Sequence, residues 1–182
     1  PPAIPGSNGN LSYRYGDKNN FIITATQLPS KRGLEPSDFT IVDRYEFSEN
    51  SDAGSKAFYH GIKLPSSEAI LHWYYYVNYP EINAIIHVHE ITDFLYSRES
   101  RAMWSNLDII ETPRNGVAGT IDLPLSVEEV LKDFNQYVIL KDHYADWDRA
   151  HTGTVVFGKT LQETFQRVSD IHQQLLTLNE CE

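Results

Sequence analysis

Cysteine and methionine are almost absent from this sequence, which has one of each in 182 residues. The lone Cys181 stands next to the last residue, so the chain has neither an internal disulfide nor a CxxC metal site. A cysteine so close to the chain end is also a weak candidate for a catalytic thiol. We therefore expect a reducing, cytoplasmic compartment.

Long apolar runs and an excess of basic charge are also missing. No stretch approaches the roughly 20 apolar residues that a membrane span requires. Acidic residues outnumber basic ones by 25 to 15, for a formal net charge of −10, whereas nucleic acids and anionic membranes attract basic surfaces. We expect neither as a partner, and an anionic substrate would have to be held by local hydrogen-bond donors.

Repeats, low-complexity linkers and clusters of glycine or proline, which would mark a domain boundary, are absent as well. We therefore expect a single domain over residues 1–182, with a core built from the 41% of residues that are hydrophobic. The start, Pro1-Pro2-Ala3-Ile4, has neither a Met nor the apolar stretch of a signal peptide. From this we expect that an upstream segment is missing.

The pattern of the chain mixes strands with a few helices. Short β-branched or aromatic runs bounded by turn residues predict strands at Leu11–Tyr15, Phe21–Thr26, Phe39–Val42, Ala84–His89, Ile109–Glu111, Tyr137–Lys141 and Thr154–Phe157. Ser126 and Thr160 each begin a capping box, in which a Glu three residues later helps to satisfy free N–H groups at a helix start. Another helix is predicted from Ser66 to about Tyr79, between two prolines.

Apolar spacing gives two of these helices an expected inner face. In the helix from Ser66 this face holds Ile70, Trp73, Tyr74 and Val77. In the C-terminal helix it holds Leu161, Phe165, Val168, Ile171, Leu175 and Leu178. His72 follows Glu68 by four residues, and we expect it to be a hydrogen-bonded core histidine rather than a catalytic one.

Two imidazoles stand at the end of an apolar strand. His87 and His89 are two positions apart, so strand alternation points both side chains to the same face. Zinc favours imidazole ligands, and a catalytic zinc site typically has three protein ligands and one open position. The pair alone is weak evidence for a metal, because histidine often serves packing.

The segment just before the predicted helix is suited to binding an anion. Ser66 and Ser67 offer two hydroxyls and free N–H groups at a helix N-terminus. Glu68 follows in the first turn, where a carboxylate can move a proton at a carbon next to a metal-polarised carbonyl, or can simply cap the helix dipole. Near the start of the chain, Gly9 permits close backbone approach and the Asn10 amide can bind an oxyanion, although alone this motif is only a turn.

Four motifs in this order resemble the signature segments of the class II aldolase/adducin family. They are Gly9-Asn10-Leu11-Ser12, Phe21-Ile22-Ile23-Thr24-Ala25-Thr26, Leu64-Pro65-Ser66-Ser67-Glu68 and His87-Val88-His89. Residues 80–86 and 158–163 resemble the family as well, so the similarity covers nearly the whole chain. The resemblance implies an α/β fold of three layers, α/β/α, with a central mostly antiparallel sheet. It also implies a zinc ion held by three histidines and a homotetramer with active sites between subunits.

The resemblance further implies roles for individual residues. His87 and His89 match two zinc ligands, and Glu68 matches the acid/base glutamate. The residues that match the phosphate-binding cradle are Gly9, Asn10, Thr26, Ser66 and Ser67. This cradle would explain how an acidic protein holds an anion.

Three features depart from the family pattern. Where family members usually have Ser-Gly after the second strand, this sequence has Thr26-Gln27, which keeps one hydroxyl but loses the glycine. The loss raises the alternative of an unphosphorylated substrate. The usual Asn-His-Gly hairpin is replaced by a longer segment, in which His143 or His151 could be the third zinc ligand. His143 keeps the family's register after its strand, whereas His151 keeps the nearby Gly153. We also expect the chain to lack the helix that opens family members, ahead of the first motif.

The expected function is that of a zinc-dependent lyase. By resemblance, zinc would chelate a small sugar phosphate or keto-sugar and stabilise an enediolate while Glu68 transfers a proton. Aldol cleavage is the first hypothesis, and a pentulose-phosphate 4-epimerase or a sugar-phosphate dehydratase is the alternative on the same site. A noncatalytic adducin-like scaffold is the alternative of another class. Asp93 and Tyr96, just after the histidine pair, are candidates for the residues that distinguish the reactions.

Overall fold

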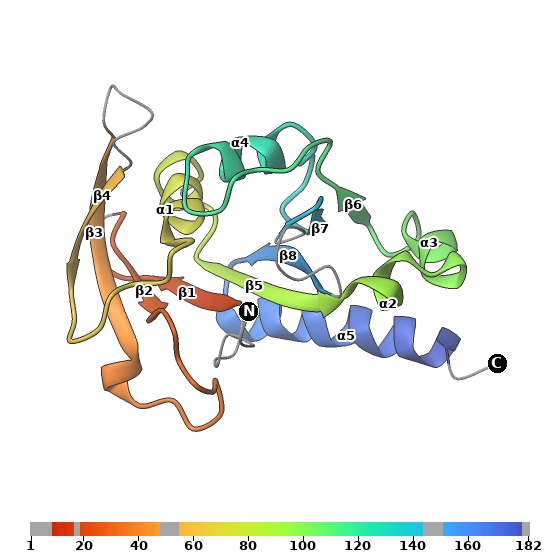
Figure 1. Cartoon of the computed structure of the whole chain (residues 1–182), viewed down its shortest axis with the longest axis horizontal. Coiled ribbons are helices and arrows are strands. Elements are labelled where there is room, and N and C mark those ends of the chain that lie inside the picture. Colours follow the sequence, from red (N-terminus) through yellow and green to blue (C-terminus); the bar gives the residue numbers. More distant parts are fainter. Residues whose placement is uncertain (1–8, 17–18, 48–54, 144–150, 180–182) are drawn as a thin grey trace, which may run out of the picture.

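One eight-stranded sheet organises the protein (Figure 1). The computed structural model describes residues 9–16, 19–47, 55–143 and 151–179. The strands are β1 Asn10–Arg14, β2 Phe21–Thr24, β3 Phe39–Phe47, β4 Ser55–His60, β5 Ala84–Ile91, β6 Ile109–Glu111, β7 Tyr137–Leu140 and β8 His151–Gly158. Their order across the sheet is β4-β3-β2-β1-β5-β8-β7-β6, and every neighbouring pair is antiparallel except β6 and β7. The prediction of a mostly antiparallel sheet is confirmed.

Helices cover both faces of this sheet. They are α1 Ala69–Asn78, α2 Thr92–Tyr96, α3 Arg98–Met103, α4 Asp122–Glu128 and α5 Leu161–Asn179, with a short 3₁₀ turn at Pro36–Asp38. In Figure 1, α1 and α4 lie on one side of β5 and β8, and α5 runs along the other side. No helix among the described residues is long and apolar enough to cross a bilayer.

Strand alternation divides the core into two clusters, one on each face. Ile85 and Val155 pack with residues of α1 and α4, whereas their neighbours Ile86 and Val156 pack with residues of α5. The three-layer α/β/α arrangement predicted from the sequence is therefore confirmed. Because His87 is two residues after Ile85, it belongs to the face that α1 covers.

The sheet edge formed by β3 and β4 differs most from the sequence prediction. The strand β4 was not predicted, and β3 continues to Phe47 instead of ending at Val42. Both segments carry charged residues and are only half covered, so they lack the apolar pattern by which a strand is identified. The Arg44 guanidinium lies 3.7 Å from the centre of the Phe58 ring and links the two strands by a cation–π contact. At the centre of the sheet, β8 begins at His151, three residues before its predicted start.

The predicted helix starts were right at one capping box and wrong at the other. The backbone N–H of Glu163 donates to Thr160 Oγ1 at 3.1 Å, and α5 begins at Leu161 as expected. The start predicted at Ser126 was wrong, because α4 begins at Asp122 and the Ser126 hydroxyl donates instead to the Leu123 carbonyl. A proline in the first turn of α4 concealed this start, although proline is tolerated there. The helix α1 begins at Ala69 instead of Ser66.

The predicted inner faces were only partly right. In α1 Ile70 is buried, but Val77 is 36% exposed while Tyr75 and Tyr76 are buried, because this helix contacts both the sheet and α4. In α5 the buried residues are Thr164, Val168, Ile171 and Leu175. Phe165, predicted to be buried, is 64% exposed. Thr164 takes the inner position of that turn instead, against Gly158 of β8.

Two adjacent leucines of α5 test this orientation. Leu175 is 0% exposed and Leu176 is 51% exposed, so truncation to alanine empties a packed site in the first case only. We expect Leu175→Ala to lower the free energy of unfolding by about 2–5 kcal/mol and Leu176→Ala to change it by less than about 0.5 kcal/mol, as measured by urea denaturation. Equal losses in the two variants would contradict the orientation of α5.

Candidate active site

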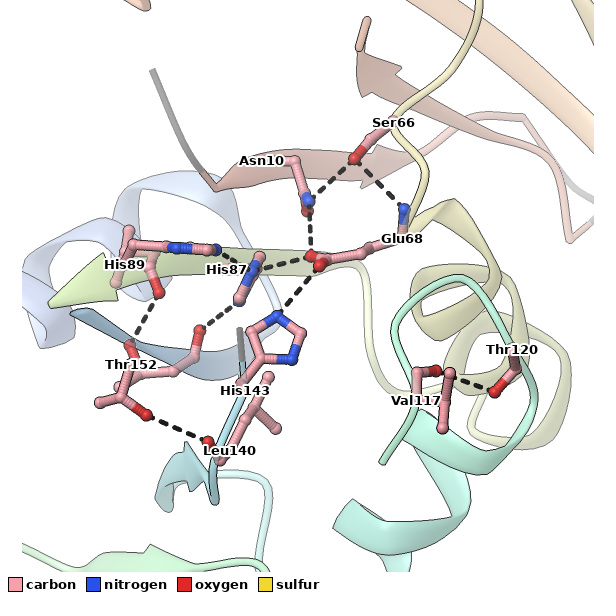
Figure 2. Close-up of polar contacts among 12 residues, drawn as sticks. Asn10, Ser66, Glu68, His87, His89, Val117, Thr120, Leu140, His143 and Thr152 are labelled. Atoms are coloured by element: carbon pink, nitrogen blue, oxygen red, sulfur yellow. Dashed lines mark hydrogen bonds and ion pairs between the residues drawn. The ribbon is translucent and has the colours of Figure 1, made fainter. Parts of the chain in front are cut away.

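The strand β5 brings two imidazoles together on the face that α1 covers. His87 is 1% exposed, and its Nε2 lies 3.1 Å from Nε2 of His89 (Figure 2). In the antiparallel pairing with β8, His87 lies opposite Val155 and His89 lies opposite Gly153. The strand alternation inferred from the sequence therefore has the expected result, since both rings reach the same space.

Glu68 and His143 enter that space from two other segments. Glu68 directly precedes α1 and is 2% exposed; its Oε2 lies 2.8 Å from His87 Nε2, and its Oε1 lies 3.0 Å from His143 Nε2. His143 follows β7 after a tight turn. With His89, these side chains form a group whose ligand atoms all lie within 4.8 Å of one another. The sequence also allowed Glu68 to act as a cap of the helix dipole; Glu68 is the residue that caps α1, and its side chain makes no capping hydrogen bond to the helix backbone.

The donor set of this group fits a divalent metal. His87 Nδ1 lies 2.8 Å from the Thr154 carbonyl oxygen, to which an Nδ1–H donates, and this leaves Nε2 to face the group. Burial, and next the charge of His87, lower the pKa of His89 to about 3, so its ring is neutral near pH 7. Three imidazoles and a carboxylate are ligands that zinc favours.

The carboxylate is held in its ionised form. Burial alone would raise the pKa of Glu68, but the charge of His87 and the hydrogen bonds from both histidines lower it well below the ordinary value. Burial works against a charged His87, yet Glu68 raises the pKa of that ring above its ordinary value. A metal would therefore displace a proton from this group when it binds.

Of the two candidates for a third histidine, His143 joins the group and His151 does not. Asp142 has a φ of +52°, and the backbone N–H of His143 donates to the Leu140 carbonyl at 3.2 Å, so the chain reverses just after β7. This reversal directs His143 toward Glu68. His151 begins β8 and is paired with Ile91 at the end of β5.

Gly153 was not among the predicted site residues, although the space around it determines how the histidines fit. A Cβ atom at this position would lie 2.8 Å from His87 Cε1 and would overlap the ring of His143. Only a glycine therefore leaves room for both rings. In the sequence Gly153 was noted only as a glycine near His151, and no local pattern indicates that it lies opposite His89 on the neighbouring strand.

Asn10 and Ser66 support the carboxylate. Asn10 Nδ2 donates to Ser66 Oγ at 3.0 Å and to Glu68 Oε2 at 3.2 Å, and the Glu68 N–H approaches Ser66 Oγ at 3.4 Å (Figure 2). Gly9, with a φ of +83°, lies against β5, since an added Cβ would be 2.5 Å from the His87 carbonyl oxygen. Three of the predicted cradle residues, Gly9, Asn10 and Ser66, thus lie beside the group of Glu68 and the histidines, but the Asn10 amide donates to protein oxygens.

The remaining predicted cradle residues lie around this core. The Thr26 N–H donates to the Leu64 carbonyl at 3.0 Å, which joins the segment after β2 to the one before α1. Ser67 is exposed. Gln27, which stands where the family usually has glycine, has a φ of +55°. The backbone therefore keeps the left-handed conformation that glycine favours although the glycine itself is missing.

A loop before α4 also borders the site. An added Cβ at Gly119 would lie 3.4 Å from the Ser67 carbonyl oxygen. Figure 2 shows Val117 and Thr120 of this loop, which is closed by a hydrogen bond of 2.8 Å from the Thr120 hydroxyl to the Val117 carbonyl. This loop was not predicted from the sequence to be part of the site.

Other residues noted in the sequence lie outside the group. His72 is 0% exposed and its Nδ1 lies 2.6 Å from Ser12 Oγ, as expected for a core histidine. Asp93 is exposed on α2, and the Tyr96 hydroxyl donates to Glu111. Neither Asp93 nor Tyr96 belongs to the group of four that Glu68 forms with the three histidines.

The close approach at Gly153 predicts the effect of adding one methyl group there. In Gly153→Ala the new Cβ would overlap His143 and crowd His87, so we expect the metal content to fall well below that of the wild type. Overpacking of this kind also costs about 1–3 kcal/mol of stability. Elemental analysis and urea denaturation measure the two effects. Full metal content at unchanged stability would contradict the geometry.

Comparison with known proteins identifies the family of this chain. Residues 3–175 match the family described as Class II Aldolase and Adducin N-terminal domain. A relative named methylthioribulose-1-phosphate dehydratase, from Methylococcus capsulatus, is 34% identical over 93% of this chain and 86% of its own length. One of the same name from Picosynechococcus sp. is 25% identical over 59% of this chain, and the match spans only 47% of that relative's length.

Solved structures share the fold. An L-fuculose 1-phosphate aldolase aligns over 94% of this chain and 74% of its own, with a TM-score of 0.65 and 21% identity. A sugar-phosphate aldolase from Thermotoga maritima aligns over 97% of this chain and 85% of its own, with a TM-score of 0.68 and 18% identity. The chain belongs to the class II aldolase and adducin family and is an enzyme of that superfamily.

Proposed function

We propose that this protein is a metal-dependent lyase that removes water from a small ketose phosphate. In this proposal His87, His89 and His143 hold a divalent metal, zinc being the ion that best suits the donor set, and Glu68 is the acid/base residue. The observation that carries the proposal is the buried Glu68 carboxylate, which lies within 3.0 Å of two of these three imidazoles. A homotetramer in the cytoplasm, inferred from the resemblance and the composition, stays a prediction.

Glu68 has the protonation state and the position that proton transfer requires. A bound divalent metal polarises a substrate carbonyl and so makes the neighbouring C–H group more acidic. Glu68 is ionised at neutral pH and takes that proton as a general base. Asn10 donates to Oε2 and Ser66 approaches the Glu68 backbone N–H, so the carboxylate is oriented before the substrate arrives.

Dehydration requires that the same residue then acts as an acid. After the proton leaves, the bond from the next carbon to its hydroxyl breaks and a carbon–carbon double bond forms. Glu68 returns the proton to the departing hydroxyl, which leaves as water. Because Glu68 is 2% exposed, bulk water has little access to the proton that it holds in between.

The choice of dehydration rests on the named relatives. From the sequence alone, aldol cleavage was the first hypothesis and a dehydratase was among the alternatives. The Methylococcus capsulatus relative, which is named a dehydratase and is matched over 86% of its length, reverses that order. A noncatalytic scaffold is disfavoured because the chain keeps all three histidines and the glutamate within one group.

Glu68→Gln tests this role. The amide keeps the shape of the side chain but cannot accept the proton, so we expect turnover to fall by about two to four orders of magnitude with the metal content preserved. The assay is mass-spectrometric detection of water loss from phosphorylated pentuloses. Glu90→Gln is the matched control, because Glu90 is on β5 but bonds to His172 of α5, with Nε2 of that ring 2.6 Å from Glu90 Oε1. Near-normal turnover in Glu68→Gln would remove Glu68 from the mechanism.

A further inference from the structure

A buried serine joins the strand that carries Asn10 to the helix that follows Glu68. Ser12 lies two residues after Asn10 on β1, so strand alternation puts both side chains on the face that α1 covers. His72 lies one helical turn after Glu68. Ser12 Oγ lies 2.6 Å from His72 Nδ1, and both residues are 0% exposed. The contact therefore links β1 to the start of α1, next to the pair formed by Asn10 and Glu68.

The same serine hydroxyl also reaches Tyr76, one turn further along α1. Ser12 Oγ lies 2.7 Å from the Tyr76 hydroxyl, which in turn lies 3.5 Å from the Asn83 carbonyl oxygen. Tyr76 is 0% exposed as well. Burial of such polar side chains is costly unless their hydrogen bonds are made. The chain of contacts therefore favours one placement of α1 on β1.

The environment of His72 assigns its proton to Nδ1. Burial, and next the charge of His87, lower the pKa of His72 to about 3, so near neutral pH the ring carries a single N–H. Among the described residues, no group hydrogen-bonds to His72 Nε2. Orphaned buried N–H groups are rarer than unsatisfied acceptors, so the proton belongs on Nδ1, which donates to Ser12. Ser12 then donates to Tyr76, and Tyr76 to the Asn83 carbonyl, so every donor in the chain has an acceptor.

The bond between Asn10 and Glu68 depends on this placement of α1. Asn10 Nδ2 donates to Glu68 Oε2 at 3.2 Å (Figure 2), which is at the long end of the range for N–H···O bonds. A small shift of α1 along β1 would therefore break it. The shorter contact between Ser12 and His72 lies between the same two elements and opposes such a shift.

We propose that Ser12 and His72 are positioning residues, which hold the start of α1 on β1 so that Asn10 stays bonded to the Glu68 carboxylate. Neither residue touches the substrate. The proposal gives a role to the last residue of the motif Gly9-Asn10-Leu11-Ser12 and to a histidine that otherwise only fills the core. This inference rests on the proposed function, because it assumes that Glu68 is the acid/base residue.

Ser12→Ala tests the proposal in the zinc-loaded enzyme, with water loss from a phosphorylated pentulose as the assay. We expect kcat to fall by about tenfold to a hundredfold through misalignment of Glu68, with KM and zinc content within about twofold of the wild type. Ser100→Ala is the matched control, because Ser100 is also 0% exposed and its hydroxyl donates to the Phe94 carbonyl at 2.7 Å, outside the group of four. Equal losses of kcat in the two variants would overturn the positioning role.

Two substitutions of His72 separate its hydrogen bond from its packing. Leucine fills the space of the ring but cannot donate to Ser12. Asparagine fills the space less well, but its amide N–H can take the place of Nδ1–H. We expect His72→Asn to keep more of the wild-type kcat than His72→Leu, whereas a role in packing alone predicts the reverse order.

A double-mutant cycle shows whether Ser12 acts through Asn10. In the Asn10→Ala background the bond to Glu68 is already lost, so Ser12→Ala should lower kcat much less there than in the wild type. Independent losses that multiply would contradict the proposal.

Two further results separate this proposal from the proposed function. Nitrogen NMR of His72 needs no turnover, and we expect a neutral ring with its proton on Nδ1; a proton on Nε2 would overturn the direction of the chain. Loss of turnover in Glu68→Gln, together with equal kcat values for Ser12→Ala and Ser100→Ala, would leave the proposed function standing and refute the positioning role. Normal turnover in Glu68→Gln would refute the mechanism and, with it, the role of Ser12 in turnover.

Discussion

The antiparallel pairing of β5 with β8 is the constraint on which the candidate site depends. It sets His89 opposite Gly153 and places the Thr154 carbonyl where His87 Nδ1 reaches it. A slip of one residue would turn both histidines to the face that α5 covers, because strand side chains alternate. The same register puts the residue without a side chain where two imidazole rings need room. The grouping of these metal-ligating side chains is thus mainly a consequence of sheet pairing, and the surrounding helices contribute to it.

The buried carboxylate of Glu68 is the second feature on which the candidate site depends. An ionised carboxylate that is 2% exposed is costly unless its charge is compensated. Here two imidazoles and the Asn10 amide provide that compensation, and all of them come from different strands or turns. Distant parts of the sequence therefore stabilise the group jointly. The group forms only when four segments are in place: β1, the turn before α1, β5 and the turn after β7.

Much of this site could be predicted from the sequence because its signals are local. The spacing of His87 and His89 on a strand and the position of Glu68 at a helix start follow from periodicity and from the order of the family's motifs. The choice between His143 and His151 could not be made in this way, because it depends on a positive φ at Asp142 that reverses the chain. The space at Gly153 likewise depends on which residues face each other across two strands.

In the fold, too, the elements with a local sequence pattern could be predicted, and those that depend on contacts between distant residues could not. The strands β1, β2, β5 and β7, which contain apolar runs, were predicted to within two residues of their observed bounds, whereas β8 begins three residues before its predicted start. The edge strand β4 and the end of β3 were missed, because charged and half-exposed residues carry little periodic signal. The exposure of Phe165 depends on Thr164 filling the inner position of that turn, which helical spacing alone does not reveal.

Elemental analysis of the purified protein tests most directly the proposal that three histidines of this group hold a metal. The wild type would be measured beside His87→Ala, His143→Ala and His151→Ala, without added metal. If the proposal is right, we expect near-stoichiometric zinc in the wild type and in His151→Ala, and loss of zinc in the other two variants. Absence of metal from the wild type even after reconstitution with zinc, or zinc retained in His143→Ala but lost in His151→Ala, would contradict it.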